Sequence, residues 1–448
     1  MTGTIFALSS APGRAGVAVI RVSGPAAGAV YRTLSRRALP AARQAVLVRL
    51  FEPCDGASGG GIDQGLAIWF PGPHSYTGED SVEFQVHGGV AVVAAVLDAI
   101  GRVEGTHLAE PGEFTRRAFV SGKIDLTEAE GVIDLIDAET NAQRRQALRQ
   151  AGGALGALYD RWRDQLVSVL AHFEALLDFP DEDLPTDVAD RVENDILRLE
   201  EQISQHLDDN RRGERLRNGV RIAIIGPPNA GKSSLLNLLA ERDVAIVSEV
   251  AGTTRDVIET HLDLGGLPVT LADTAGIRES EDAVEAEGVR RARRTADEAD
   301  LKIMVLDSQD IQGDFGDSDR IDPETIVVMN KVDLGPMVGE SQSAFQAARG
   351  LYEVSVRTGA GLDPFLKGLT EAVRGLLDVS DAPVITRARH RASLEEVRHA
   401  LRNSRSAPLP ELAAEDIRLA VRSLGRITGS VDIEDLLDVV FRDFCIGK

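Results

Sequence analysis

Cysteine is scarce in this sequence, whose 448 residues contain only Cys54 and Cys445. Two cysteines are too few for a disulfide framework. Long apolar runs are also missing, because the longest, residues 90–100, is interrupted by Asp98 and falls short of the ~20 residues that span a bilayer. Residues 1–20 lack the basic start, apolar block and cleavage site of a secretory signal. We therefore expect a cytoplasmic protein in a reducing compartment, with no membrane partner.

Positive charge is in short supply as well. The chain has 49 Lys and Arg against 71 Asp and Glu, a formal net charge of −22. A surplus of acid on this scale argues against diffuse electrostatic coating of nucleic acid as the main activity, so any RNA contact must be local. The apolar fraction of 43% is ordinary for a globular protein. At roughly 150 residues per domain, the length predicts about three domains.

The first part of the chain has the pattern of a mixed α+β domain. Residues 16–22 and 81–86 alternate or run as strands, bounded by Pro and Gly. From Gly112 the character of the sequence changes, and apolar residues follow helical spacing through residues 118–150 and 155–179. We therefore place the boundary of an N-terminal domain, residues 1–118, at this change of period.

A second change of period begins at Val220. Short apolar strands then alternate with helices, a pattern typical of a largely parallel α/β sheet, and a hairpin turns at Gly265 and Gly266. Helical spacing returns after residues 378–383, and it predicts helices at residues 392–403, 414–424 and 433–441. The sequence thus predicts an all-α domain made of residues 119–215 and 379–448, interrupted by an α/β domain of residues 216–378.

Residues 226–233 fit the phosphate-binding pattern G-x-x-x-x-G-K-S, with a buried strand before them and an apolar helix after them. Phosphates need unobstructed backbone amides at a helix start, which the two glycines permit. Lys232 can reach the terminal phosphates and Ser233 can ligate Mg²⁺. The nucleotide contacts expected here are Asn229, Ala230, Gly231, Lys232, Ser233 and Ser234.

Three later segments identify the nucleotide as GTP. The carboxylate of Asp333 can accept two hydrogen bonds from guanine, which adenine cannot supply, and the amide of Gly276 can sense a γ-phosphate. Four such elements in order at strand ends are unlikely by chance. They predict a Ras-like P-loop GTPase domain whose further GTP contacts are Asp273, Thr274, Ala275, Gly276, Asn330, Lys331, Asp333, Ser355, Val356 and Arg357.

The group that assists hydrolysis is left open by the residues themselves. Ras-like enzymes place a Gln that orients water directly after the Asp-Thr-Ala-Gly segment, and this chain has Ile277 there. An alkyl chain cannot hydrogen-bond water. Another polar group must act, and Glu285, Arg278 and Arg255 are the candidates in the flanking segments. A solvated surface carboxylate is the competing interpretation of Glu285.

With both flanks included, the sequence resembles the MnmE/TrmE family of tRNA modification GTPases over essentially its whole length. The segments that carry the resemblance are residues 11–17 (APGRAGV), 76–80 (YTGED), 87–89 (HGG), 111–115 (PGEFT), 123–126 (KIDL), 251–256 (AGTTRD) and 444–448 (FCIGK).

The resemblance implies an N-terminal domain that dimerises and binds a 5-formyltetrahydrofolate-type folate. It also implies a flavoprotein partner, MnmG, with which the family forms a 5-carboxymethylaminomethyl-type group on the wobble uridine of certain tRNAs, using a folate one-carbon unit and GTP hydrolysis. Arg21, Glu83, Lys123 and Lys448 are the implied folate contacts. Glu79 is an alternative to Glu83.

For the GTPase domain, the resemblance implies a K⁺ ion that occupies roughly the place of an arginine finger, with Mg²⁺ on Ser233 and Thr254. Asn229 with Ser248, Val250 and Thr253 would hold K⁺, and oxygen ligands suit such a hard cation. Glu285 matches the family's catalytic Glu. The resemblance also implies GTP or GDP contacts in residues 248–254, namely Ser248, Glu249, Val250, Ala251, Gly252, Thr253 and Thr254.

The C-terminal segment is expected to reach back to the N-terminal folate pocket. Gly447 permits close backbone approach to a ligand, and Lys448 places an ammonium near the thiol of Cys445, which we list among the catalytic candidates. The competing interpretation is a packed Phe444 with a frayed end.

Two other functions compete with tRNA modification. One is a GTP-timed ribosome or RNA assembly factor, and the other is a regulatory GTPase whose flanks only bind proteins. Both are disfavoured by the folate-like N-terminal half and the tail. Arg387, Arg391 and Arg402 belong to a basic run that is either a tRNA-facing patch or a solvated helix face. The Asp-rich residues 306–323 predict a short or irregular helix.

Overall fold

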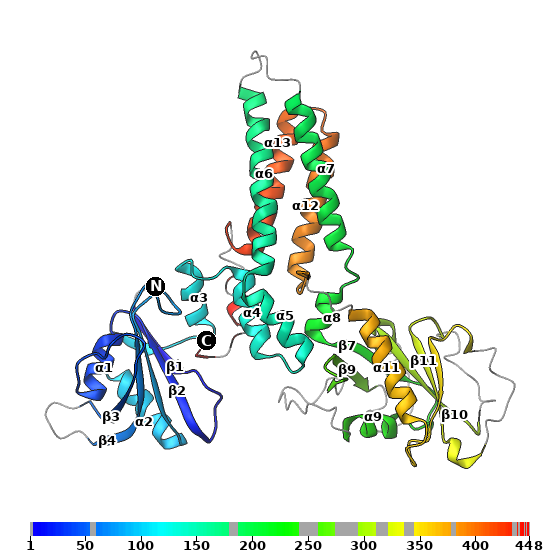
Figure 1. Ribbon diagram of the computed structural model, residues 1–448, viewed down its shortest axis with the longest axis horizontal. Coiled ribbons are helices and arrows are strands. Elements are labelled where there is room, and N and C mark those ends of the chain that lie inside the picture. The colour runs from blue at the N-terminus through cyan, green and yellow to red at the C-terminus, as the bar shows by residue number, and fades with distance from the viewer. Residues whose placement is uncertain are drawn as a thin grey trace, which may run out of the picture. The chain divides into compact units, whose positions relative to one another are not determined.

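The computed structural model (Figure 1) contains two compact units. One comprises residues 1–133, 151–160 and 424–448, and the other residues 134–150 and 161–423. Each unit is described by itself. The residues that the structure describes are 3–53, 60–178, 187–241, 259–273, 294–310, 321–335, 345–377, 382–431, 437, 440–442, 444, 446 and 447.

The first unit is built on a six-stranded sheet in the order β3-β4-β5-β2-β1-β6. Its apolar core includes Ile20, Tyr31, Phe84 and Ile100, from the sheet and from the two helices packed on it. The strands are β1 (Thr4–Leu8), β2 (Ala15–Ser23), β3 (Ala45–Phe51), β4 (Gly61–Phe70), β5 (Ser81–Gly88) and β6 (Thr106–Leu108), and the helices are α1 (Ala27–Ser35) and α2 (Val90–Gly101).

The helical stretch expected at residues 118–150 is broken twice, into α3 (Glu113–Val120), α4 (Leu126–Ile136) and α5 (Asn141–Ala151). Both breaks are made by local side-chain caps. The Glu128 amide donates to Asp125 Oδ1 at 2.8 Å while the Asp125 amide donates to Glu128 Oε2 at 2.7 Å. Thr140 and Gln143 exchange the same kind of bonds ahead of α5. Such reciprocal bonds are typical of a helix N-terminus, and they favour a new helix even where the apolar residues continue at helical spacing.

The long helices are α6 (Ala154–Asp178), α7 (Asp187–Leu207), α12 (Ala388–Ser406) and α13 (Pro410–Thr428), and the short α8 (Arg212–Asn218) leads into the second sheet. The predicted helices 392–403 and 414–424 lie within α12 and α13, whereas the one at 433–441 falls partly outside the described residues. None of the described helices is long and apolar enough to cross a bilayer.

Three arginines of the basic run at the start of α12 and along it are paired with carboxylates of the protein. Arg387 pairs with Asp134 at 2.9 Å, Arg391 with Asp209 at 2.6 Å and with Glu214 at 2.7 Å, and Arg402 with Glu200 at 2.7 Å. Guanidinium groups engaged in this way are less available to phosphates. The structure therefore gives no support to a tRNA-facing patch at these arginines.

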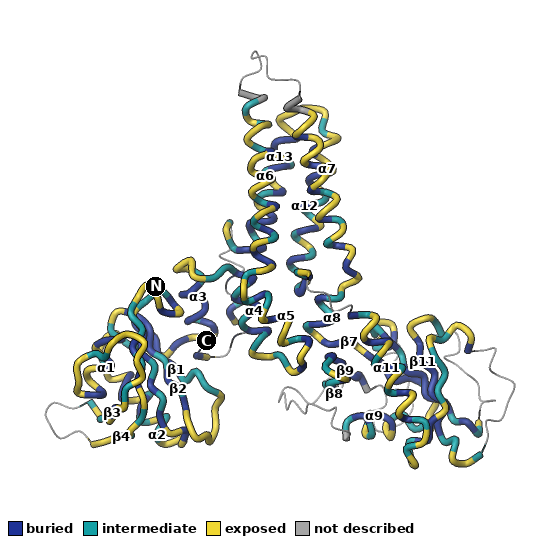
Figure 2. Tube along the Cα trace, in the orientation of Figure 1, coloured by how far each residue is buried: buried dark blue, intermediate teal, exposed yellow. Residues whose placement is uncertain are grey.

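The second unit contains a six-stranded sheet in the order β12-β11-β10-β7-β9-β8, parallel except for the β8–β9 hairpin. Its strands are β7 (Val220–Ile225), β8 (Glu259–Asp263), β9 (Pro268–Asp273), β10 (Leu301–Asp307), β11 (Thr325–Asn330) and β12 (Gly350–Glu353), with α9 (Lys232–Glu241) and α11 (Leu362–Leu377). Every β11 residue is buried, as Figure 2 shows.

The two sheets and the long helices confirm the predicted fold class, an α+β N-terminal part, a helical part and an inserted α/β P-loop domain. The hairpin turns at Gly265 and Gly266, both at positive φ, as expected from the sequence. Most of the Asp-rich stretch, residues 311–320, lies outside the described residues.

Candidate functional site

The loop between β7 and α9 has the backbone of a phosphate cradle. Gly226 and Gly231 lie at φ +132° and +101°, and Asn229 at φ +60°. A Cβ on Gly226 would stand 2.2 Å from the carbonyl oxygen of Val305 on β10, so only glycine fits. The loop leads directly into the helix N-terminus, where amide groups and the helix dipole favour an anion.

The side chain of Lys232 lies over this loop. Its Nζ donates to the carbonyl oxygens of Gly226 at 2.7 Å and Pro227 at 2.8 Å. Ser233 and Ser234 are exposed in the first turn of α9. The ammonium and the serine hydroxyl therefore occupy positions from which they can engage phosphate and its Mg²⁺.

Asn330 joins two of the predicted segments. Its side chain is buried, its Nδ2 donates to the Ala230 carbonyl at 2.8 Å, and its Oδ1 accepts from the Val356 amide at 3.1 Å. One amide group thus ties the phosphate loop to the segment after β12. Residues far apart in sequence are brought to one edge of the sheet, as predicted from their strand-end positions.

The carboxylate of Asp333 is held at the same edge. Ser355 Oγ donates to Asp333 Oδ1 at 2.7 Å, and Arg357 Nε lies 3.9 Å from Asp333 Oδ2. The Asp333 side chain is 17% exposed, so it is fixed but reachable. This geometry leaves the carboxylate able to accept hydrogen bonds from a purine edge.

Replacing Asp333 by Asn should exchange guanine for xanthine preference. The carboxylate's accepted bonds are lost, while the amide suits the reversed donor pattern of xanthine, so GTP affinity should fall by about 100-fold or more. Titration with fluorescent GTP and XTP analogues measures both affinities. Unchanged GTP affinity in Asp333→Asn would show that base recognition lies elsewhere.

Asp307 is a residue of this site that the sequence analysis did not assign. It ends β10, and its Oδ2 accepts from Lys331 Nζ at 2.6 Å, where Lys331 stands at φ +65°. Partial burial raises the pKa of the Asp307 carboxyl, but the Lys331 ammonium and the Gln309 amide outweigh it and hold that pKa below its usual value. Its position at a strand end beside Asn330 was the available signal.

Several predicted residues lie outside the described residues. They are Ser248, Glu249, Val250, Ala251, Gly252, Thr253, Thr254, Thr274, Ala275, Gly276, Glu285, Cys445 and Lys448, together with the side chain of Asp273 and the hydrolysis candidates Arg255 and Arg278.

In the first unit the structure pairs two of the predicted folate residues. Arg21 Nε donates to Glu83 Oε1 at 2.9 Å across β2 and β5. The Arg21 guanidinium also lies 5.3 Å from the ring centroid of Tyr76 and 5.7 Å from that of Phe114. Glu83 is therefore the ion-pair partner of Arg21, whereas Glu79 pairs with Arg117. Glu83 as a folate contact, with Glu79 as the alternative, stays a prediction.

The third predicted folate residue, Lys123, contacts a nearby loop. Its Nζ donates to the carbonyl oxygen of Pro73 at 3.0 Å. Tyr76, on the same loop, is 37% exposed, and its hydroxyl bonds to Thr115 at 2.9 Å. Burial raises the pKa of the Tyr76 phenol above its usual value. The hydrogen bond with Thr115 and the charge of Arg21 lower this pKa, but their effect is smaller. In the sequence Tyr76 belongs to the segment YTGED, and no sequence pattern predicts its contact with Arg21.

The described residues of the C-terminal segment contact the N-terminal part of the chain, whereas its reach into a folate pocket stays a prediction. Ile446 forms an antiparallel bridge with Pro111, and Ser9 Oγ donates to the Gly447 carbonyl at 2.9 Å. Gly447 stands at φ +99°, and a Cβ there would lie 2.1 Å from the Leu8 carbonyl oxygen. Close backbone approach by Gly447 is thus a feature of this structure, although the approach is to the chain itself.

Two family models match this chain, and the second of them spans the α/β insertion. Residues 4–123 match the family described as GTP-binding protein TrmE N-terminus, and residues 126–445 match the MnmE helical domain. The tRNA modification GTPase MnmE of Parvibaculum lavamentivorans is 54% identical, with 99% of this chain and 100% of that protein covered.

Two more curated relatives agree. The tRNA modification GTPase MnmE of Rhodospirillum rubrum is 51% identical, covering 99% of each chain. That of Paramagnetospirillum magneticum is 51% identical, covering 100% of each chain. Together with the phosphate cradle and the base-recognition residues, these matches show that the chain belongs to the MnmE family of tRNA modification GTPases.

Proposed function

We propose that this GTPase acts in the cytoplasm as a homodimer with a flavoprotein of the MnmG type. Together they would form a 5-carboxymethylaminomethyl-type group on the wobble uridine of certain tRNAs, using a one-carbon unit from 5-formyltetrahydrofolate. GTP hydrolysis by the inserted domain would drive or time this reaction.

The observation that carries the proposal is the Arg21–Glu83 pair beside two aromatic rings. A carboxylate, a guanidinium and the exposed ring of Tyr76 suit a flat pterin, whose edge offers donors and acceptors and whose faces stack, while the buried Phe114 supports the guanidinium from within. The described part of the C-terminal tail belongs to the same unit, where Gly447 accepts a hydrogen bond from Ser9. An ammonium at Lys448 would favour the anionic glutamate end of a folate.

In the G domain, the proposed roles follow the chemistry of each side chain. Lys232 binds the terminal phosphates, and Ser233 and Thr254 hold Mg²⁺. Asn229 with carbonyls of Ser248 and Val250 and with Thr253 holds K⁺, and Glu285 positions the attacking water. Lys232 and the P-loop amides are supported by the geometry around Gly226 and Gly231.

Binding of 5-formyltetrahydrofolate to the purified protein tests the proposed function. Isothermal titration calorimetry should give saturable binding, and Glu83→Gln should weaken it by about tenfold or more, because a charge-assisted hydrogen bond is lost. Glu52→Gln, a change of the same kind in an exposed residue of the same unit, is the control. An absence of binding would favour a GTP-timed RNA assembly factor.

A second test concerns the monovalent ion. Hydrolysis should be at least about tenfold faster in K⁺ than in Na⁺, because an ion of the wrong size leaves the transition-state charge uncompensated. Asn229→Ala should remove the difference, since the proposed side-chain ligand is gone. Phosphate release at equal ionic strength in KCl and NaCl measures both. Equal rates in the two salts for the unmodified protein would refute the K⁺ assignment.

A further inference from the structure

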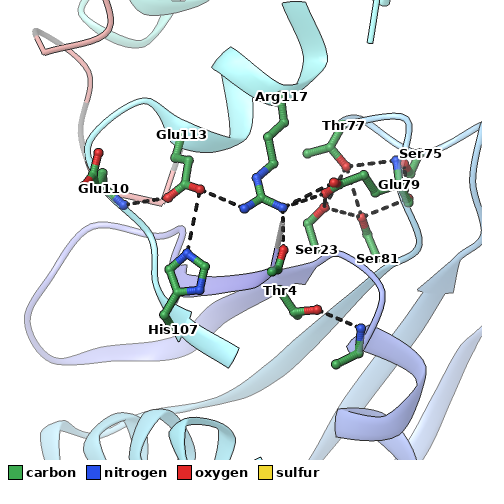
Figure 3. A network of polar contacts seen from close by, with 12 residues as sticks. Thr4, Ser23, Ser75, Thr77, Glu79, Ser81, His107, Glu110, Glu113 and Arg117 are labelled. Carbon is green, nitrogen blue, oxygen red and sulfur yellow. Dashed lines mark hydrogen bonds and ion pairs between the residues drawn. The ribbon is translucent and has the colours of Figure 1, made fainter. Parts of the chain in front are cut away.

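Arg117, on α3, is a buried charge with only 3% of its side chain exposed. Its Nη1 donates to Glu79 Oε2 at 3.0 Å and to the Gly3 carbonyl at 2.8 Å, and its Nη2 donates to Glu113 Oε1 at 2.8 Å (Figure 3). One guanidinium therefore joins two carboxylates that come from different segments. Buried charges persist only where such partners compensate them.

The Glu79 side of this network fixes residues 71–80, which we call the 71–80 loop. Glu79 Oε2 also accepts from Ser23 Oγ at 2.9 Å, at the end of β2. Within the loop, Ser75 Oγ donates to the Glu79 carbonyl at 2.5 Å, and the Glu79 amide donates to Thr77 Oγ1 at 3.3 Å. The carboxylate thus anchors the loop to β2 and to α3 at once.

The same loop carries the contacts to two of the proposed folate residues. Tyr76 presents its ring to Arg21, and Pro73 accepts from Lys123. Gly78 stands at φ +81°, and a Cβ there would lie 3.7 Å from the Lys123 side chain. A shift of the 71–80 loop would therefore move the surroundings of Arg21 and Lys123 together.

The Glu113 side of the network fixes the turn on which the C-terminal segment rests. Glu113 Oε2 accepts from the Glu110 amide at 3.0 Å. Pro111, inside this turn, bridges to Ile446. Gly112 lies so close to Phe441 that a Cβ there would stand 2.6 Å from the Phe441 carbonyl oxygen.

We propose that Arg117 is a positioning residue that holds the 71–80 loop and the turn at residues 110–113 in one arrangement. Through Glu79 it sets the folate pocket, and through Glu113 it sets the seat of the C-terminal tail. Folate binding and tail placement are then coupled by one guanidinium. This inference rests on the proposed folate-dependent function.

The two arms of the network can be separated by matched substitutions. Arg117→Gln and Glu79→Gln should each weaken 5-formyltetrahydrofolate binding by about tenfold, because a buried carboxylate or guanidinium loses its partner. Glu113→Gln should weaken folate binding less than Glu79→Gln does, yet lower tRNA modification at saturating folate by about fivefold, since only the tail seat is disturbed. Arg102→Gln, which removes an exposed pair with Asp98 in the same unit, should change neither.

The double variant Arg117→Gln/Glu79→Gln distinguishes positioning from general damage. If Arg117 acts through Glu79, the double variant should bind folate no more weakly than either single variant. Additive losses would overturn the inference. If thermal melting shows that Arg117→Gln does not fold, Arg117→Lys replaces it. The lysine keeps the positive charge but cannot donate to two carboxylates in the geometry of a guanidinium, so an intermediate loss of folate affinity is expected.

The remaining outcomes are also decisive. Folded Arg117 variants with unchanged folate affinity and unchanged modification would overturn the positioning role alone. An unmodified protein that does not bind 5-formyltetrahydrofolate would overturn the proposed function, and this inference with it. Titration of the unmodified protein therefore comes first.

Discussion

Replacing Gly226 by alanine should weaken GTP binding by about 100-fold or more, equivalent to roughly 3 kcal/mol. Gly226 adopts φ +132°, a conformation that costs an L side chain of the order of 1–3 kcal/mol. The new methyl group would also meet the Val305 carbonyl oxygen at 2.2 Å and the Val305 carbonyl carbon at 3.1 Å. Both partners are backbone atoms of β10, so the loop rather than the strand must move.

A displaced loop no longer points its amides at the phosphates, which is why affinity suffers more than stability. Titration with a fluorescent GTP analogue gives the affinity, and thermal melting shows whether the domain is folded. Gly375→Ala is the matched control. Gly375 is exposed in α11, with nothing within 4 Å of an added Cβ, so that change should leave GTP affinity unchanged and stabilise the helix by about 0.5–1 kcal/mol.

Wild-type GTP affinity in a folded Gly226→Ala protein would mean that the phosphate loop tolerates another backbone path. The close approach of Gly226 to β10 would then be a packing detail without a part in nucleotide binding. An equal loss of affinity in Gly375→Ala would point instead to a general effect of glycine replacement.

The parts of the fold that local chemistry determines could be predicted from the sequence. The buried strand before residue 226, the helix after it and the turn at Gly265 each follow from period, glycine placement or run length. The breaks on either side of α4 were missed. They depend on the reciprocal bonds of Asp125 with Glu128 and of Thr140 with Gln143, which an apolar pattern does not record.

The candidate sites show the same division. Asn330 and Asp333 were predictable because a motif at a strand end carries its own geometry. Asp307 was missed although it also ends a strand, because its partner Lys331 is distant in sequence. Arg117 was not predictable, because it gains its role from Glu79, another distant residue. The pairing of Arg21 with Glu83 rather than with Glu79 depends on strand register, which the sequence does not show, since both carboxylates lie in the same short stretch.

Deleting residues 445–448 should abolish tRNA modification and weaken folate binding while K⁺-stimulated GTP hydrolysis persists. The tail contributes to the first unit, through the Ile446 bridge to Pro111 and the Gly447 bond to Ser9. Phe444 remains in the shortened chain, where it is buried against Phe441 at a ring distance of 5.5 Å. The nucleotide site belongs to the other unit, so its chemistry should be spared.

Two point variants separate the placement of the tail from its chemistry. Gly447→Ala should reproduce most of the loss although Cys445 and Lys448 are retained, because the added Cβ would meet the Leu8 carbonyl oxygen at 2.1 Å and displace the tail. Cys445→Ser should keep folate binding, and it should lose modification only if the thiol takes part in the reaction. Ile446→Ala changes a side chain that is 60% exposed and should have little effect.

The decisive measurement is the fraction of modified wobble uridine in tRNA from cells that lack the native gene and carry each variant. Folate affinity and phosphate release are measured on the same purified proteins. Loss of modification with intact hydrolysis would assign the tail to the folate-dependent step, because a G-domain defect would lower both. Normal wobble-uridine modification by the chain that ends at Phe444 would instead leave the tail as a packing element of the first unit, and the bridge at Pro111 would have no part in catalysis.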